Sequence, residues 1–262
     1  MIKILELNKV YNEDCIGDKG MCLIKDKSVD LILCDLPYGT TACKWDHIIT
    51  PDKLWEQYER IIKDNGAIVL TASQPFTTAL ISSNYKLFKY CWVWEKSRPG
   101  DIFNAKNKPL KAHEDICVFS KGTTANGSKR RMKYLPQGVG EGGVITNNPD
   151  DKEYAFKGKR PSHKEKHITQ GSNYPRSVIK IANPNKGSIH PTQKPVTLFE
   201  YLIKTYTNEG EIVLDNCMGS FTTAIACINT NRNYIGFEND DKYFVLGQER
   251  VRLHNEGLLV NK

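Results

Sequence analysis

The run Val29–Cys34 (VDLILC) constrains the fold of this chain most, because five of its six side chains are apolar. Runs of this kind are typical of strands that are buried on both faces of a parallel sheet. Other strand patterns follow it along the chain, at residues 67–71, 89–94, 115–120, 212–214 and 234–237. Helical patterns are interspersed with them, at residues 50–66, 76–84, 195–208, 222–229 and 242–253. This alternation predicts βαβ units, so we expect one doubly wound α/β domain with a mostly parallel sheet.

Residues 121–186 interrupt this pattern with a segment rich in Gly, Asn, Pro and basic side chains. The segment carries 14 Lys and Arg against 5 Asp and Glu, whereas the rest of the chain has 23 basic and 25 acidic residues. Clustered positive charge favours a polyanionic partner, because neutralising phosphates releases counterions. A solvated surface loop explains the charge equally well. We expect an inserted recognition segment at 121–186, between two halves of one domain at 1–120 and 187–262.

The sequence shows no pattern of a membrane protein or a metal-binding protein. No apolar run in the 262 residues is long enough to cross a bilayer, and the first residues lack the pattern of a secretory signal. The eight cysteines include no C-x-x-C pair of the kind that binds zinc or forms a redox dithiol. We therefore expect a cytoplasmic protein with no membrane partner and no metal site.

The tetrapeptide Asp35-Leu36-Pro37-Tyr38 directly follows Val29–Cys34, at the carboxyl end of a predicted buried strand. Ligands of open parallel sheets bind beyond the carboxyl ends of the strands. The Asp35 carboxylate and a backbone carbonyl group can accept hydrogen bonds from both hydrogens of an NH2 group, while Tyr38 stacks on the attached ring. Pro37 has a fixed φ and helps to hold these acceptors in place. Asp-x-Pro is also common where a strand turns into a loop, so the tetrapeptide alone leaves both interpretations open.

A second candidate site surrounds the turn that follows the predicted strand at 212–214. Asp215 ends this strand, Gly219 lies in the turn, and Glu238 ends the next strand, 23 residues after Asp215. An acidic residue at about this separation from a glycine-containing βα turn is placed to bind ribose hydroxyl groups. The turn has no G-x-G-x-x-G pattern, which disfavours a pyrophosphate cradle. A nucleoside cofactor without phosphates fits better.

Together these motifs resemble the β group of amino DNA methyltransferases, and the resemblance covers nearly the whole chain outside 121–186. The catalytic D-P-P-Y motif of that family is matched by Asp35-Leu36-Pro37-Tyr38, and its D-P-F-x-G-S-G-T cofactor turn is similar to Asp215–Thr222. The H-P-T-Q-K-P signature of these enzymes is present at His190–Pro195. The motif order, with the catalytic motif first and the cofactor turn last, is typical of the β group. It corresponds to a circularly permuted form of the Rossmann-like methyltransferase fold.

The resemblance implies a catalytic half at 1–120 and a cofactor-binding half at 187–262. The catalytic residues are expected to be Asp35, Leu36, Pro37 and Tyr38. S-adenosylmethionine is the expected cofactor, and the residues expected to bind it are Asp14, Cys15, Asp35, Thr192, Gln193, Lys194, Asp215, Asn216, Cys217, Gly219, Ser220, Phe221, Thr222, Glu238 and Asn239. Double-stranded DNA is the expected partner, and the residues expected to contact it are Lys44, Trp45, Lys96, Arg98, Arg130, Arg131, Lys159 and Arg160. A solvated surface position is a nearly equal alternative for Lys44, Lys96 and Arg98.

The implied activity is site-specific methyl transfer to N6 of a flipped-out adenine by direct displacement. N4-cytosine methylation is the first alternative, although enzymes of that type usually begin the catalytic motif with serine. Carbon-5 cytosine methylation is rejected, because that chemistry needs a nucleophilic cysteine, usually after a proline, and no cysteine here follows one. A protein-glutamine or RNA methyltransferase would explain the cofactor turn, but neither His190–Pro195 nor the position of the basic segment.

Two residues depart from the family pattern. Leu36 replaces the first proline of D-P-P-Y, and its carbonyl group remains available as an acceptor. Phe221 replaces the second glycine of G-S-G-T, so its ring either occupies space used by the cofactor or turns into the core. We expect the first arrangement, which keeps a further alternative open, a catalytically impaired DNA-binding relative. The motifs do not determine the recognition sequence, a cognate restriction enzyme as partner, or the choice between a monomer and a homodimer.

Overall fold

The computed structural model describes residues 5–39, 47–141, 171–184, 189 and 192–258. The predicted site residues Lys44, Trp45, Lys159 and Arg160 lie outside these ranges, as do His190 and Pro191. The chain forms two compact units. The larger unit consists of Met1–Leu135 and Ser177–Lys262, and the smaller one of Pro136–Arg176.

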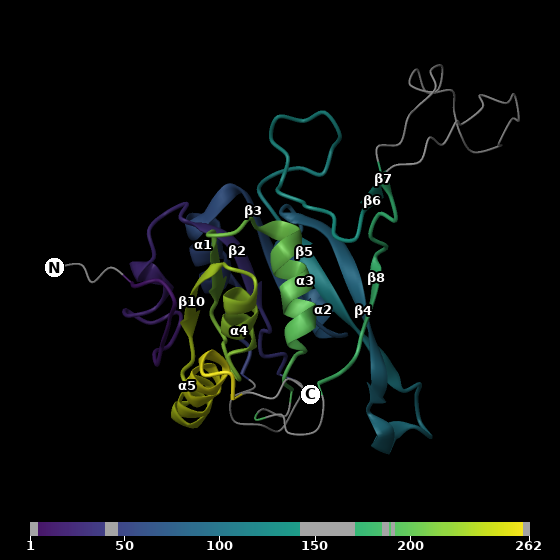
Figure 1. Ribbon diagram of the computed structural model, residues 1–262. Coiled ribbons are helices and arrows are strands. Elements are labelled where there is room, and N and C mark those ends of the chain that lie inside the picture. The colour runs from purple at the N-terminus through teal and green to yellow at the C-terminus, as the bar shows by residue number, and fades with distance from the viewer. Residues whose placement is uncertain (1–4, 40–46, 142–170, 185–188, 190–191, 259–262) are drawn as a thin grey trace, which may run out of the picture. The chain divides into compact units, whose positions relative to one another are not determined.

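An eight-stranded sheet forms the centre of the larger unit (Figure 1). The strand order is β1 (Lys9–Tyr11), β10 (Asn233–Phe237), β9 (Ile212–Asp215), β2 (Val29–Cys34), β3 (Ile62–Ala72), β5 (Lys111–Phe119), β4 (Phe88–Gly100) and β8 (Val178–Ile181). Neighbouring strands are parallel, except that β5 runs antiparallel to both β3 and β4. This mostly parallel sheet confirms the predicted α/β fold class.

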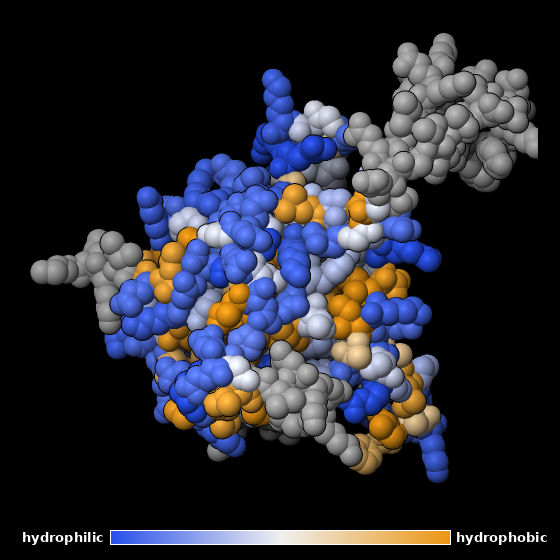
Figure 2. Space-filling view, in the orientation of Figure 1, coloured by the Kyte–Doolittle hydropathy of each residue, from blue (hydrophilic) through white to orange (hydrophobic). Residues whose placement is uncertain are grey.

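Helices follow most of the parallel strands, as the sequence pattern predicts. Within the described residues they are η1 (Met21–Leu23), α1 (Pro51–Ile61), α2 (Phe76–Ser83), η2 (Ile102–Asn104), α3 (Val196–Tyr206), α4 (Thr222–Asn229) and α5 (Asp241–Asn255). None of the helices in the described part of the chain is long and apolar enough to span a membrane. Figure 2 shows a largely hydrophilic surface, with scattered apolar residues, over the face where Figure 1 places α3, α4 and α5.

Alternate side chains of β2 pack against different helix layers. Ile32 and Cys34 belong to a buried cluster that includes residues of α1 and α2. Leu31 and Leu33 belong to a second buried cluster that includes residues of α3 and α4. Because successive side chains of a strand point to opposite faces, the helices must cover both faces of the sheet. The doubly wound arrangement thus follows directly from the apolar run at Val29–Cys34.

One predicted helix boundary was wrong. Gly66 was expected to close the helix that begins near residue 50, but α1 ends at Ile61 and Gly66 lies inside β3. The register between β2 and β3 shifts at this point, so that Val29 pairs with Ile62 and Leu31 with Ala67. A Cβ atom at Gly66 would lie 2.8 Å from the Asp30 carbonyl oxygen. Glycine is therefore needed here for close approach between strands rather than for a helix end.

Four short strands of the described residues, β1, β6, β7 and β8, were not predicted. β8 lies inside the expected recognition segment at 121–186, yet it pairs in parallel with β4, with Val178 opposite Val93. Residues 121–135 also belong to the larger unit. The compact smaller unit, which contains β6 (Gly140–Glu141) and β7 (Gly171–Ser172), is therefore shorter than the segment that stands out by composition.

Candidate active site

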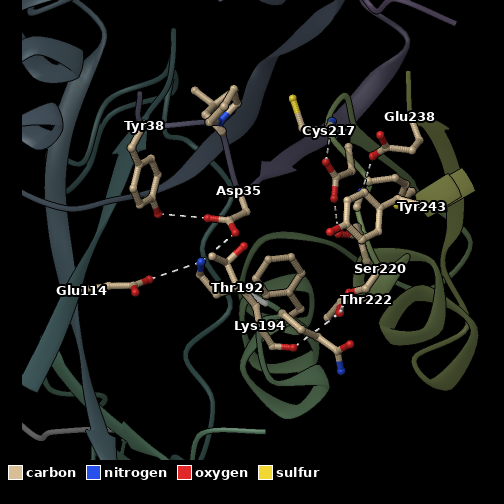
Figure 3. Close-up of a pocket in the computed structure, with 18 of the residues that line it drawn as sticks. Asp35, Tyr38, Glu114, Thr192, Lys194, Cys217, Ser220, Thr222, Glu238 and Tyr243 are labelled. Carbon is tan, nitrogen blue, oxygen red and sulfur yellow. Dashed lines mark hydrogen bonds and ion pairs between the residues drawn. The ribbon is translucent and has the colours of Figure 1, made fainter. Parts of the chain in front are cut away.

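The candidate site lies where three neighbouring parallel strands end. Asp35 follows β2, Asp215 is the last residue of β9, and Glu238 follows β10. All three residues line one cavity of about 1050 Å³, part of which is drawn in Figure 3. The cavity thus occupies the position at which ligands bind in open parallel sheets.

Most of the predicted site residues line this cavity, although they come from distant parts of the sequence. Those that do are Asp14, Cys15, Asp35, Leu36, Pro37, Tyr38, Lys96, Arg98, Thr192, Gln193, Lys194, Asp215, Asn216, Cys217, Gly219, Ser220, Thr222, Glu238 and Asn239. Of the predicted residues that the structure describes, only Phe221, Arg130 and Arg131 do not. The fold therefore brings the early and late motifs together in one place.

Three side chains hold the Asp35 carboxylate at the cavity wall. Its Oδ1 accepts hydrogen bonds from the hydroxyl groups of Tyr38 (2.9 Å) and Thr71, and its Oδ2 accepts one from the ammonium group of Lys194 (2.6 Å; Figure 3). The Tyr38 ring stacks on Phe76, with the ring centroids 5.2 Å apart. Burial first, and then the Asp35 charge, raise the pKa of Tyr38 well above its usual value. The phenol therefore stays a neutral donor, and the carboxylate is held as an acceptor.

Lys194 contacts both the predicted catalytic motif and the predicted cofactor turn. Its side chain is 6% exposed, and its Nζ lies 2.6 Å from Asp35 Oδ2 and 3.4 Å from Glu114 Oε2. Burial by itself lowers the pKa of Lys194, but the two carboxylates outweigh this and raise it. We expected Lys194 to bind the cofactor. Its ammonium group contacts Asp35, and its carbonyl oxygen lies 3.4 Å from the Thr222 hydroxyl group of the turn, so the cofactor contact stays a prediction.

Glu238, the predicted ribose-binding acid, contacts the backbone of the turn. Its Oε2 accepts a hydrogen bond from the Gly219 N–H (2.7 Å), and its Oε1 accepts one from the Asp240 N–H (2.9 Å). Burial raises the pKa of Glu238. Because each carboxylate oxygen has about two acceptor positions, both oxygens can still accept from hydroxyl groups in the cavity.

The Asp215 carboxylate accepts two hydrogen bonds that hold the turn in place. Its Oδ1 accepts the Cys217 N–H at 3.0 Å, and its Oδ2 accepts the Thr223 hydroxyl group. The side chain is almost fully buried, and this burial raises the pKa of Asp215 from 3.8 to about 6. The carboxyl group therefore links the end of β9 to the start of α4.

Arg250 supports the same turn from α5, and no sequence motif indicated it. Its Nη1 donates to the Ser220 carbonyl oxygen at 2.6 Å and to the Thr222 hydroxyl oxygen at 3.0 Å. Burial lowers the pKa of Arg250 to about 10, so the guanidinium group stays charged near neutral pH. The turn is thus braced on one side by Asp215 and on the other by Arg250.

Cysteines near the turn are neutral thiols. Burial raises the pKa of Cys34 to about 12. A hydrogen bond with Cys217, followed by burial, raises the pKa of Cys15. A protonated thiol is a poor nucleophile, because the thiolate is the reactive form. The described residues contain no cluster of three or more side chains suited to a metal ion.

Phe221 turns away from the cavity, contrary to our expectation. Its backbone has φ 60° and ψ 30°, and its ring is 1% exposed and packs beside Phe244 of α5, 6.0 Å between centroids. A Cβ atom added at Gly247 would overlap the ring. The prediction that this ring fills cofactor space was wrong. The left-handed backbone that a glycine would adopt is kept, and the side chain leaves on the far side of the turn, where Gly247 gives it room.

The predicted DNA contacts fall at two separate places. Lys96 and Arg98 line the active-site cavity. Arg130 and Arg131 instead line a smaller cavity of about 550 Å³ at the start of β3, together with Lys86, Lys121, Lys129, Glu59, Asp64, Asn65 and Leu87. Thr71, which contacts Asp35, lies six residues beyond Asn65 on the same strand, roughly 20 Å away at the usual rise per residue. The structure therefore does not bring Arg130 and Arg131 to the catalytic motif.

Several cavity residues were missed by sequence reasoning. They include Lys111, Glu114, Thr223 and Tyr243. Glu114 carried little signal, because it lies beside Asp115 in the polar first half of β5, and the sequence pattern shows neither its burial nor its need for a charged partner. The identity of that partner required the register of β4 and β5 and the position of the loop before α3.

The geometry agrees with the class of protein that the motifs resemble. Asp35 after β2 and Glu238 after β10 line one cavity of a mostly parallel sheet, as expected for a methyltransferase with a permuted motif order. The DNA methylase family model matches residues 29–249. The DNA adenine methyltransferase YhdJ of Escherichia coli (strain K12) is 44% identical over 243 residues, covering 87% of this chain and 78% of that protein. The chain belongs to the DNA methylase family.

Two further similarities agree with this assignment. The type II methyltransferase M1.MboII of Moraxella bovis is 28% identical over 281 residues, which cover 95% of this chain and all of that protein. The crystal structure of the M1.HpyAVI–SAM complex superimposes with a TM-score of 0.58 and 24% identity, over 92% of this chain and 98% of that one. This last similarity concerns the fold.

Proposed function

We propose that this DNA methylase transfers a methyl group from S-adenosylmethionine to N6 of adenine in double-stranded DNA. The observation that carries the proposal is the Asp35 carboxylate, held at the wall of the same cavity as Glu238. The name of YhdJ, a DNA adenine methyltransferase, supports adenine as the target. The presence of Asp35 where serine is usual in N4-cytosine enzymes supports the same choice.

The residues of the cavity fit S-adenosylmethionine as cofactor. Glu238 would accept hydrogen bonds from the ribose hydroxyl groups, since both its oxygens keep acceptor positions. The single glycine of the turn, Gly219, suits a nucleoside without phosphates. Phe221 leaves the cavity clear. When bound, the cofactor supplies an electrophilic methyl group on a sulfonium sulfur.

The protein's own contribution to the reaction is orientation. Asp35 Oδ1 already accepts from Tyr38 and Thr71, and Oδ2 accepts from Lys194, so Oδ2 has about one acceptor position left for an amino hydrogen. The Leu36 carbonyl group accepts the second hydrogen. With both hydrogens held, the lone pair of the amino nitrogen points in one direction, and the Asp35 charge stabilises the positive charge that develops there.

Access of the target base requires that it leave the duplex, since the amino group is otherwise inside the base stack. The Tyr38 ring is held between its hydroxyl contacts to Asp35 and Thr71 and its stacking on Phe76. We infer that the flipped base stacks on Tyr38. A planar ring fixed at one edge and supported by a second aromatic ring is a rigid platform.

Two alternatives to adenine methylation are separated by one experiment. N4-cytosine methylation would use the same acceptors, because cytosine also presents an exocyclic amino group. A catalytically impaired relative was favoured only by the expected position of Phe221, which was wrong. Purified protein would be incubated with duplex DNA of mixed sequence and methyl-labelled S-adenosylmethionine, and the nucleosides would then be analysed. Label in N6-methyldeoxyadenosine is expected. Label in N4-methyldeoxycytidine would replace the adenine assignment, and unlabelled DNA despite cofactor binding would overturn methyl transfer.

A further inference from the structure

Four charged side chains of alternating sign form a row along the catalytic side of the cavity. Lys96 of β4 pairs with Glu114 Oε1, Glu114 Oε2 lies 3.4 Å from Lys194 Nζ, and Lys194 pairs with Asp35 Oδ2 at 2.6 Å. Lys194, Glu114 and Asp35 are drawn in Figure 3. The row connects two antiparallel strands, the loop before α3 and the end of β2. The two ammonium groups and two carboxylates of the row have a net charge of zero.

Burial makes this balance important. The side chains of Lys194, Glu114 and Lys96 are 6%, 10% and 13% exposed. Burial alone raises the pKa of Glu114, but the ammonium groups of Lys194 and Lys96 outweigh it and hold that pKa below its usual value. An isolated buried charge costs several kcal/mol, so each member of the row depends on its neighbours.

One carboxylate oxygen of Glu114, Oε2, is less well paired than the other. Among the described residues, its Oε2 has no hydrogen-bond partner, although Lys194 lies close enough for an ion pair. The Lys194 ammonium group thus lies between two carboxylates, and its shorter contact is with Asp35. An ammonium group held between two carboxylates cannot follow either one freely, which limits the positions that Asp35 can take.

We propose that Glu114 is a positioning residue for methyl transfer, acting through Lys194 to fix the Asp35 carboxylate in its amino-binding position. This inference rests on the proposed function, because it assigns a role within the same reaction. Glu114 is not a catalytic residue in this scheme, since its ion pairs are with Lys194 and Lys96 rather than with the reacting atoms.

The proposal makes the protonation of Lys194 sensitive to Glu114. The charged or titratable groups that face Lys194 are Asp35 after β2, Tyr38 in the following loop, Glu114 and Lys111 from β5, and Lys96 from β4. Loss of the Glu114 charge leaves three ammonium groups near one carboxylate. The pKa of Lys194, now raised by Asp35 and Glu114, would then fall, so Lys194 would lose its proton at lower pH.

The test compares Glu114→Gln, which keeps shape but removes charge, with Glu114→Asp, which keeps charge. For Glu114→Gln we expect kcat to fall roughly 10- to 100-fold, as small misplacements of reacting groups do. We expect unchanged cofactor affinity, and an alkaline limb of the pH–rate profile that moves to lower pH by about one unit. Glu114→Asp should restore the alkaline limb and part of kcat.

Two controls separate positioning from general damage. Glu211→Gln removes a half-buried glutamate that pairs with Lys133 at the start of β9, whereas the cavity lies at the end of that strand, and it should leave kcat and the pH profile unchanged. Lys96→Met removes the other partner of Glu114 together with one nearby positive charge, so its alkaline limb should not move to lower pH. Thermal melting of all variants shows whether they are folded.

A readout without turnover distinguishes failure of this inference from failure of the proposed function. The side-chain ¹⁵N signal of Lys194 would be titrated with pH in the wild type and in Glu114→Gln. We expect a lower apparent pKa of Lys194 in the variant, whether or not the wild type methylates DNA. If the wild type methylates nothing, the proposed function and the role of Glu114 in catalysis are both wrong. The charge coupling between Glu114 and Lys194 would still be shown by the titration. Wild-type kcat and an unmoved alkaline limb in Glu114→Gln would overturn the inference. So would a loss of kcat that only follows loss of folding in both Glu114 variants.

Discussion

Phe221 and Gly247 are complementary: the Phe221 ring occupies the space that a side chain at position 247 would need. Phe221 lies at the start of α4 with φ 60°, a backbone conformation in which glycine is favoured. Gly247 lies inside α5, where glycine is normally unfavourable. Each residue is locally a poor choice, and each is explained by the other.

This relationship predicts a change of sign in a double-mutant cycle. In the wild type, Gly247→Ala should destabilise by about 1–3 kcal/mol, because the added methyl group overlaps the ring. In a Phe221→Gly background the same change should stabilise by up to about 1 kcal/mol, since alanine favours a helix over glycine. Urea unfolding of the four proteins measures both values. Equal effects of Gly247→Ala in the two backgrounds would refute the pairing.

Phe221→Gly alone should lower stability without improving cofactor binding. Loss of a buried ring costs about 3–5 kcal/mol, and relief of the left-handed backbone returns about 1–2 kcal/mol. A net loss of about 1–4 kcal/mol is therefore expected, with the affinity for S-adenosylmethionine unchanged by calorimetry. Tighter cofactor binding in the glycine variant would mean that the ring does reach the cofactor.

Strands could be predicted from the sequence where an apolar run was long enough to have a single structural interpretation. Val29–Cys34 was assigned with its observed bounds, because all its side chains are buried and the pattern has no other explanation. β8 was missed, because four residues within a basic segment leave too short a pattern. Gly66 was misassigned, because glycine at a helix end and glycine at a close strand contact look alike in sequence.

The position of a candidate site residue could be predicted where that residue stands at the end of a strand, as for Asp35 and Glu238, which both line the cavity. Contacts that depend on three-dimensional register could not. Lys194 lies 159 residues after Asp35, and sequence spacing does not show that its ammonium group reaches that carboxylate. The direction of the Phe221 ring was equally hidden, because it depends on the absence of a side chain at Gly247.

Asp35→Ala should reduce methyl transfer by at least about 100-fold, since it removes the charged acceptor for the amino group. The fold should persist, because the buried Lys194 ammonium group keeps Glu114 as a partner. Single-turnover methylation and cofactor titration measure the two properties. Asp52→Ala, an exposed position in the first turn of α1, is the control and should be silent. Near-normal turnover of Asp35→Ala would remove Asp35 from the mechanism.

Lys96 and Arg98 should carry more of the salt dependence of DNA binding than Arg130 and Arg131. The first pair lines the active-site cavity, whereas the second lies at the opposite end of β3. On a short duplex, Lys96→Met with Arg98→Met should flatten the log–log salt slope by about 0.9 for each phosphate that the variant no longer neutralises. Arg130→Ala with Arg131→Ala should leave the slope unchanged, contrary to the expectation from charge clustering alone. A flatter slope only in the second pair would reverse the assignment.

Asp215 predicts a pH-dependent stability that can be isolated with Asp215→Asn. Burial raises the pKa of this carboxyl group from 3.8 to about 6, so the folded protein binds its proton more tightly than the unfolded chain does. The resulting stabilisation is fully present below the unfolded pKa and is lost as pH rises through the folded one. The wild type minus Asp215→Asn difference in unfolding free energy should therefore fall by about 1.4 kcal/mol per pH unit between about pH 4 and 6, and then level off.

Asp64→Asn is the matched control, because pairing with Lys27 lowers the pKa of that exposed carboxylate and its difference should not fall over the same range. Urea unfolding at half-unit pH steps measures both curves, and a difference for Asp215 that rises with pH would show that its carboxylate is stabilised rather than opposed by the fold.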